Sequence, residues 1–180
     1  KTLLPKTPGA LTEAELKAWL DEPGIPAFAT KARSRNFSIV DTARIAWQGS
    51  GKLPSAQITG EWGTQEWVHF IDGMGKTLPV DKLAALDQAY KFTGTANGEI
   101  AMRWYPLAIR SGYLEANEAA GAFIERVGRR KLILPIYAEL VKTPEGLAFA
   151  KAAFEKAKPS YHPITTASVQ DMLDKASAGK

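Results

Sequence analysis

Three consecutive cations, Arg129, Arg130 and Lys131, follow Gly128 and form the cluster whose residue types and spacing suggest the most specific chemistry. If the glycine ends a helix and the next residues are extended, side chains two positions apart share a side. Arg129 and Lys131 are then expected to project together, while Arg130 points toward solvent or an acidic neighbour. An arginine fork can hold a carboxylate through two parallel hydrogen bonds, and lysine adds a mobile point charge. The spacing predicts half of a pocket for a peptide's terminal carboxylate or an acidic lipid head, completed by a partner surface.

The same cluster has a simpler interpretation. Cations at the C-terminal end of a helix interact favourably with the helix dipole, by about 0.3–1 kcal/mol per charge. On that interpretation the three side chains stabilise the end of a helix and bind nothing.

Residues for catalysis or metal binding are sparse in the rest of the chain. There is no cysteine, and the two histidines, His69 and His162, are far apart and belong to no H-E-x-x-H motif. We expect His69 to pack beside aromatic residues and His162 to cap or pack at the start of a helix. Ser111 and Ser160 lack a neighbouring base or a nucleophile-elbow pattern. No catalytic residue, metal ligand or bound cofactor is therefore predicted in this chain.

Helical periodicity dominates the sequence, and no convincing strand pattern with a period of two residues is present. Residues 49–63 are rich in Gly, Ser and Pro and are expected to form a long loop. The predicted helices cover approximately residues 12–20, 37–48, 64–72, 80–90, 98–108, 114–127, 134–141, 144–156 and a last segment after residue 163.

Several helix starts carry clear capping signals. Thr12 with Glu15 forms a capping box, Asn97 and Thr64 are good N-caps, and Thr143 is followed by proline at the first helical position. The short connections between these helices indicate stacked helix pairs in an α-solenoid or a compact bundle. The chain is therefore predicted to be all-α.

Composition limits the possible partners. The chain has 180 residues, 45% of them hydrophobic, and a net charge of +4. No apolar run reaches the roughly 18 residues of a membrane span. The mild basicity permits anion binding, but no recognised nucleic-acid motif accompanies the cluster or the basic stretch Lys31–Arg35. We therefore expect neither a membrane nor a nucleic-acid partner, and a chain without cysteine is compatible with either the cytoplasm or the periplasm.

Several segments, taken in order, resemble a known family. They are Trp19–Leu20 with Pro23–Pro26, Trp67–Ile71, Asn97–Trp104, Gly128–Leu132 with Pro135, and Tyr161–Thr165. Together they resemble the C-terminal domain of the leukotriene A-4 hydrolase/aminopeptidase family of zinc metallopeptidases. The resemblance covers nearly the whole chain. Two residues depart from the common pattern, because Arg130 stands where an apolar residue is frequent and Gly98 where serine is.

The resemblance implies a two-layer α-α superhelix, ARM/HEAT-like, of about nine helices. It implies that zinc lies in a separate upstream catalytic domain, absent from this chain, against which this domain packs. It also implies that Arg129 and Lys131 receive the free carboxylate of short peptide substrates. The chain alone is then expected to be inactive, and the whole protein to act as a peptidase without epoxide hydrolase activity.

The expected organisation is a linker over residues 1–11 followed by one helical domain over residues 12–180. Its partners are the upstream catalytic domain of the same polypeptide and a short peptide. The alternative is a helical-repeat module that binds another protein and has no catalytic role, in which case a wide apolar patch should remain on its surface.

Overall fold

The computed structural model describes residues 11–30 and 34–179. The chain forms two compact units, Lys1–Ser34 and Arg35–Lys180. All regular elements in the described residues are helices, which confirms the predicted all-α class. No helix in these ranges is long and apolar enough to span a bilayer.

The first unit contains one described helix, α1 (Glu13–Asp21). Its predicted capping box is confirmed, because the Glu15 backbone N–H donates to Thr12 Oγ1 at 3.2 Å and the Thr12 N–H donates to Glu15 Oε2 at 2.8 Å. No residue of α1 is buried, and Trp19 meets Phe28 edge to face with ring centroids 6.4 Å apart. The predicted linker lies outside the described residues except for Leu11.

The second unit carries the remaining helices. They are α2 (Arg35–Ser50), α3 (Ala56–Thr59), α4 (Thr64–Asp72), α5 (Val80–Tyr90), α6 (Gly98–Arg110), η2 (Leu114–Ala116), α7 (Asn117–Arg126), α8 (Arg130–Leu140), α9 (Pro144–Ala157), η3 (Lys158–Ser160) and α10 (Pro163–Ala178).

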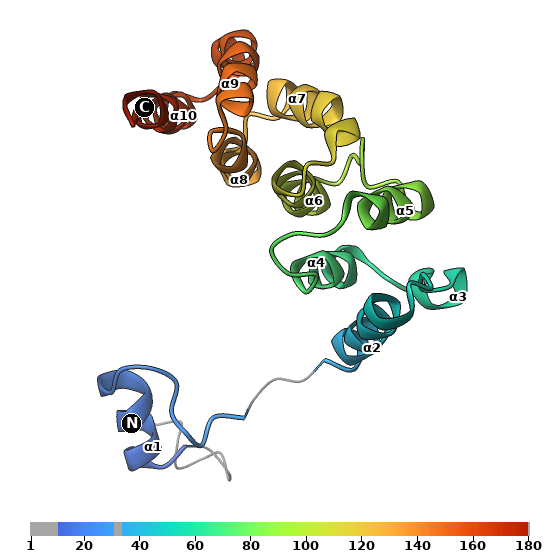
Figure 1. The fold of residues 1–180 in the computed structure, drawn as a ribbon. Helices are drawn as coiled ribbons and strands as arrows, with labels where there is room; N and C mark the ends of the chain where they lie inside the picture. The colour runs from blue at the N-terminus through green and yellow to red at the C-terminus, as the bar shows by residue number, and fades with distance from the viewer. Residues whose placement is uncertain (1–10, 31–33, 180) are drawn as a thin grey trace. The chain divides into compact units, whose positions relative to one another are not determined.

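Within this second unit the helices alternate between two layers (Figure 1). Successive even-numbered helices contact one another, from α2 through α4, α6 and α8 to α10. On the other side of this row Figure 1 shows α3, α5, α7 and α9, of which α7 and α9 pack together. The arrangement is consistent with the predicted α-α superhelix.

One continuous apolar core runs through the second unit, from Val40 in α2 to Leu173 in α10. Its largest fully buried side chains are aromatic: Trp47, Trp104, Tyr105, Tyr137, Phe70 and Phe154. The buried indole of Trp104 donates from Nε1 to Thr93 Oγ1 at 2.9 Å, which satisfies its polar atom. This core fixes α6, α8 and α10, the three helices that surround the cationic cluster.

Two predicted helix features are wrong. Thr64 is not the N-cap of α4, because Gly63 occupies that position and its N–H donates to Glu66 Oε2 at 3.1 Å. The Thr64 hydroxyl instead accepts from Asn97 Nδ2 at 2.8 Å. The segment predicted as a long loop, residues 49–63, contains the end of α2 and the short helix α3.

The remaining capping predictions are confirmed. Asn97 Oδ1 accepts from the N–H groups of Glu99 and Ile100, and Thr143 Oγ1 accepts from that of Gly146 at 3.1 Å. His162 is the N-cap of α10, where its Nδ1 accepts from the Ile164 N–H at 3.2 Å.

Candidate functional site

The cationic cluster lies at the start of a helix and not in the last turn of the helix before it. α7 ends at Arg126 with Val127 as its C-cap, and Gly128 lies between the two helices. Arg129 is the N-cap of α8, with extended dihedrals of φ −76° and ψ 110°, and Arg130 and Lys131 are its first two helical residues. The predicted start at Leu134 is therefore wrong by a full turn. The reason is that Leu132 and Ile133 are buried in the core and continue the apolar face of the helix.

The new position changes the electrostatics of the cluster. The first turn of α8 contains no acidic residue. The N-terminus of a helix carries partial positive charge and free N–H groups, so it favours anions and opposes cations. Compensation of the dipole at a C-terminus, the simpler interpretation, is therefore wrong for these side chains. The three side chains are solvent-exposed, and negative charge nearby offsets their unfavourable interaction with this helix end.

Glu99 of α6 supplies part of that charge. Lys131 Nζ donates to both carboxylate oxygens of Glu99, at 2.8 and 3.0 Å. Two neighbouring residues bring Glu99 to this place. The Asn97 cap starts α6 directly before it, and Gly98 allows α6 close to α8, since a Cβ at that position would lie 2.7 Å from Leu132 Cδ1.

The electrostatic environment of Glu99 places a second cation of the cluster nearby. The pKa of Glu99 is lowered mainly by its hydrogen bond from Lys131, and further by the charges of Lys131, Arg103 and Arg129. The predicted ion pair with Arg103 is present, at 3.8 Å. Arg129 forms no ion pair with any described residue. Its charge therefore acts on the same carboxylate as Lys131 while its guanidinium stays unpaired.

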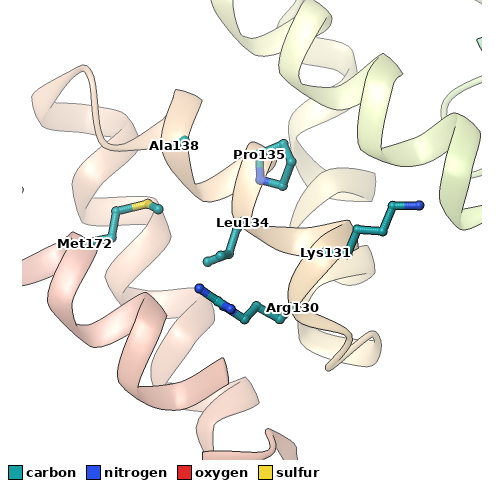
Figure 2. A pocket seen from close by; sticks show the side chains of 6 residues that line it. All are labelled: Arg130, Lys131, Leu134, Pro135, Ala138 and Met172. Atoms are coloured by element: carbon teal, nitrogen blue, oxygen red, sulfur yellow. The ribbon is translucent and has the colours of Figure 1, made fainter. Parts of the chain in front are cut away.

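The third cation lies on another side of the helix. A hollow of about 520 Å³ between α8 and α10 is lined by Arg130, Lys131, Leu134, Pro135, Ala138 and Met172. Figure 2 shows Arg130 extending toward Met172 of α10, whereas Lys131 extends the opposite way. The divergence of Arg130 from Lys131 agrees with this arrangement, but the predicted extended segment is wrong, because Arg130 and Lys131 are helical and consecutive helical residues diverge by about 100°.

The segment Tyr161–Thr165 contacts the backbone that leads from α7 into the cluster. Thr165 Oγ1 donates to the Gly128 carbonyl at 3.2 Å, and the Tyr161 hydroxyl donates to the Ile124 carbonyl at the end of α7. A Cβ at Gly128 would contact Tyr161 Cδ1 at 3.4 Å. We call Tyr161, Thr165 and Gly128 the brace. Sequence reasoning found both segments but not their contact, for which the sequence contains no local signal.

The other polar residues singled out in the sequence have structural roles. His69 Nε2 lies 3.0 Å from Asp41 Oδ1, and its ring stacks on Phe37 with centroids 4.4 Å apart. Ser111 Oγ accepts from the Leu78 N–H at 3.0 Å, and Ser160 Oγ donates to the Ala157 carbonyl at 2.8 Å. In the part of the chain that the structure describes, no three His, Asp or Glu residues gather into a set that could hold a metal ion.

Comparison with known proteins supplies the context for this geometry. The family model described as "Leukotriene A4 hydrolase, C-terminal" matches residues 62–173, which include α4 to α9 and most of α10. Leucine aminopeptidase 2-1 of Scheffersomyces stipitis is 30% identical over 183 residues, covering 93% of this chain and 29% of the relative. Leucine aminopeptidase 2 of Ajellomyces capsulatus is 27% identical over 169 residues, covering 91% and 27%.

A vertebrate relative is also similar to most of this chain. Leukotriene A-4 hydrolase of Xenopus laevis is 24% identical over 161 residues, covering 86% of this chain and 26% of its own length. The chain thus spans little more than a quarter of the length of these relatives. The family model matches well over half of the residues of this chain, and the chain therefore belongs to the leukotriene A4 hydrolase C-terminal family.

Proposed function

We propose that this chain is the C-terminal helical domain of a larger zinc aminopeptidase, and that Arg129 and Lys131 bind the free carboxylate of short peptide substrates. The observation that carries the proposal is the set of cations at the N-terminus of α8. Their positions oppose the helix dipole, and the helix has no acidic residue in its first turn. Residues that break a local stability rule in this way are expected where function requires them.

The two cations have different roles in this proposal. Arg129 is free of ion pairs with the described residues, so its fork is available for two parallel hydrogen bonds to an incoming carboxylate. Lys131 is already paired with Glu99 and has to exchange that partner, wholly or partly, for the peptide. The free N–H groups at the start of α8 add a favourable potential for the same anion.

The domain contributes positioning to the reaction. Holding the far end of a peptide fixes the scissile bond relative to the catalytic groups, and such orientation contributes several kcal/mol to lowering the barrier. By the family resemblance, zinc lies in the upstream catalytic domain, where it supplies the Lewis acid for hydrolysis. Among the described residues no three His, Asp or Glu gather into a set that could hold a metal ion, and the proposal gives these residues the binding and positioning of the peptide.

The test uses the full-length enzyme and two forms of one tripeptide, the free acid and the C-terminal amide, which lacks the negative charge. A hydrogen bond to a charged group contributes about 1.5–3 kcal/mol. At about 1.4 kcal/mol per factor of ten, Arg129→Ala should lower the acid-to-amide ratio of kcat/KM roughly 10- to 150-fold.

Arg126→Ala is the matched control. Arg126 is an exposed arginine in the last turn of α7, and its replacement makes the same change in side chain and net charge. It should leave the acid-to-amide ratio unchanged. An Arg129→Ala enzyme with the parent ratio would show that the cluster does not receive the carboxylate.

A further inference from the structure

Glu99 holds the lysine that the proposed carboxylate site requires. Lys131 Nζ donates to both oxygens of Glu99, at 2.8 and 3.0 Å. A peptide carboxylate that binds Lys131 therefore takes hydrogen bonds away from Glu99. The side chain of Glu99 is only 33% exposed, so the loss of its partner costs free energy unless another donor replaces the lysine.

Arg103, one turn further along α6, has such a donor within reach of the same carboxylate. Residues four positions apart share a face of a helix, and a glutamate four residues before a cation is the favourable order. Arg103 Nη1 lies 3.8 Å from Glu99 Oε2, which makes an ion pair but is too long for a hydrogen bond. This nitrogen is buried from solvent and has no hydrogen-bond partner among the described residues. The free protein therefore keeps an unused donor next to Glu99.

Asp72, the last residue of α4, holds the guanidinium of Arg103 from another side. Both carboxylate oxygens of Asp72 lie 3.4 Å from Arg103 Nε. The side chain of Arg103 is 26% exposed, and the next residue, Trp104, is fully buried in the core. The arginine is thus held by two helices, so a shorter contact with Glu99 requires movement of the glutamate and not of the arginine.

The movement that Glu99 has to make is small. A charge-assisted N–H···O bond is about 2.7–2.9 Å long, so Glu99 Oε2 has to approach Arg103 Nη1 by about 1 Å. The terminal torsion of a glutamate has broad minima, so the carboxylate can turn without any change in the helix. The charge of Arg103 also contributes to the lowered pKa of Glu99, after the larger effect of Lys131. Arg103 therefore favours the ionised carboxylate that it would receive.

We propose that Arg103 is a positioning residue that receives Glu99 when a peptide carboxylate binds Lys131. In the free protein, Glu99 accepts from Lys131. In the complex, the peptide carboxylate takes its place at Lys131, and Glu99 accepts from Arg103 Nη1 instead. Arg103 touches no substrate and acts only through Glu99. This inference rests on the proposed function, because it assigns the exchange of partners by which Lys131 of the same site becomes available.

The experiment measures the relative KM of the full-length enzyme, which is the KM for a free-acid tripeptide divided by that for its C-terminal amide. Arg103→Met should raise the relative KM roughly 1.4- to 5-fold, the effect of an ion pair of this exposure, and leave kcat unchanged. Arg103→Lys keeps a cation for Glu99 and should restore the parent value. Arg103→Gln can still donate to Asp72 and should act in the same direction as Arg103→Met, which tests the inference with a less disruptive change.

Arg110→Met is the matched control. Arg110 is an ion-paired arginine of α6 with a similar exposure of 31%, and it lies about 16 Å further along the helix axis than Glu99. Solvent and salt screen charges over such a distance. This variant should therefore keep the parent relative KM, and an increase equal to that of Arg103→Met would contradict the inference.

The decisive comparison repeats Arg103→Met in a Glu99→Gln enzyme. Without the displaced carboxylate Arg103 has nothing to receive, so its loss should no longer change the relative KM. If Arg103 attracted the peptide directly, its loss would raise the relative KM equally in both backgrounds, and the inference would be overturned. A parent relative KM in both Arg103→Met and Arg103→Gln would overturn it as well.

The proposed function is tested separately by Arg129→Ala. If Arg129→Ala lowers the acid-to-amide ratio of kcat/KM while the Arg103 variants behave like the parent, only the role of Arg103 is refuted. If Arg129→Ala leaves that ratio unchanged, the proposed function fails, and the role of Arg103 fails with it.

Discussion

Replacing Glu99 by glutamine tests whether this carboxylate competes with the substrate for Lys131. Both carboxylate oxygens of Glu99 accept hydrogen bonds from Lys131 Nζ, at 2.8 and 3.0 Å. A peptide carboxylate that reaches Lys131 must displace this internal partner. Glu99→Gln removes the competing negative charge and keeps the shape of the side chain, so the variant should bind free-acid peptides more tightly.

The structure limits the size of this effect. The side chains of Lys131 and Glu99 are 55% and 33% exposed, so water screens their attraction. Ion pairs with this degree of exposure contribute about 0.2–1 kcal/mol. At about 1.4 kcal/mol per factor of ten, the KM for a free-acid tripeptide relative to its amide should fall roughly 1.4- to 5-fold.

The assay is steady-state hydrolysis of the free-acid and amide tripeptides by the full-length enzyme. Glu118→Gln is the control, because Glu118 is an exposed acid in the first turn of α7, and its loss changes the net charge equally. If the relative KM of Glu99→Gln rises, then Glu99 orients Lys131 toward the substrate, and the idea that the two carboxylates compete is refuted.

Two further predictions concern the stability of the intact protein. In a denaturant titration, Gly146→Ala should lower the free energy of unfolding by about 1–3 kcal/mol, because a Cβ there would collide with the backbone carbonyl of Leu140. Gly49→Ala is the control, because Gly49 lies in α2 with open space around it, and this change should be neutral or stabilising in the same titration. Because the folded-state pKa of Glu99 is lowered from 4.5, its contribution to stability is present above that value and is lost as the pH falls through the folded pKa. As the pH falls from about 5 to about 3, the melting temperature of Glu99→Gln should therefore decrease less than that of the parent. An equal decrease of the two melting temperatures would contradict this assignment.

Local signals explain which parts of the fold could be predicted from the sequence. The caps at Thr12, Asn97 and Thr143 depend on residues two or three positions away, so a short window contains all the necessary information. The start of α8 could not be found in this way. Its first turn, with three cations and no capping side chain, is held by burial of Leu132 and Ile133 against distant residues.

The cationic cluster could be recognised in the sequence, but the geometry around it could not. The cluster was visible as a run of cations, and the expectation that Arg130 diverges from Lys131 agrees with the structure. The contacts of the site join residues far apart in sequence. Lys131 meets Glu99 across 32 positions, and Thr165 meets Gly128 across 37. No periodicity or spacing rule encodes such pairs.

The brace has a consequence for how this protein can vary. Thr165 donates to the Gly128 carbonyl and Tyr161 to the Ile124 carbonyl, so a change in either of them is expected to move the start of α8, and the cations with it, without touching any ligand. Two stretches of sequence that look like separate motifs therefore constitute one mechanical unit. A homologue with an altered residue at either end should compensate at the other, and grafting the cationic run alone into another helical scaffold should not transfer its binding properties.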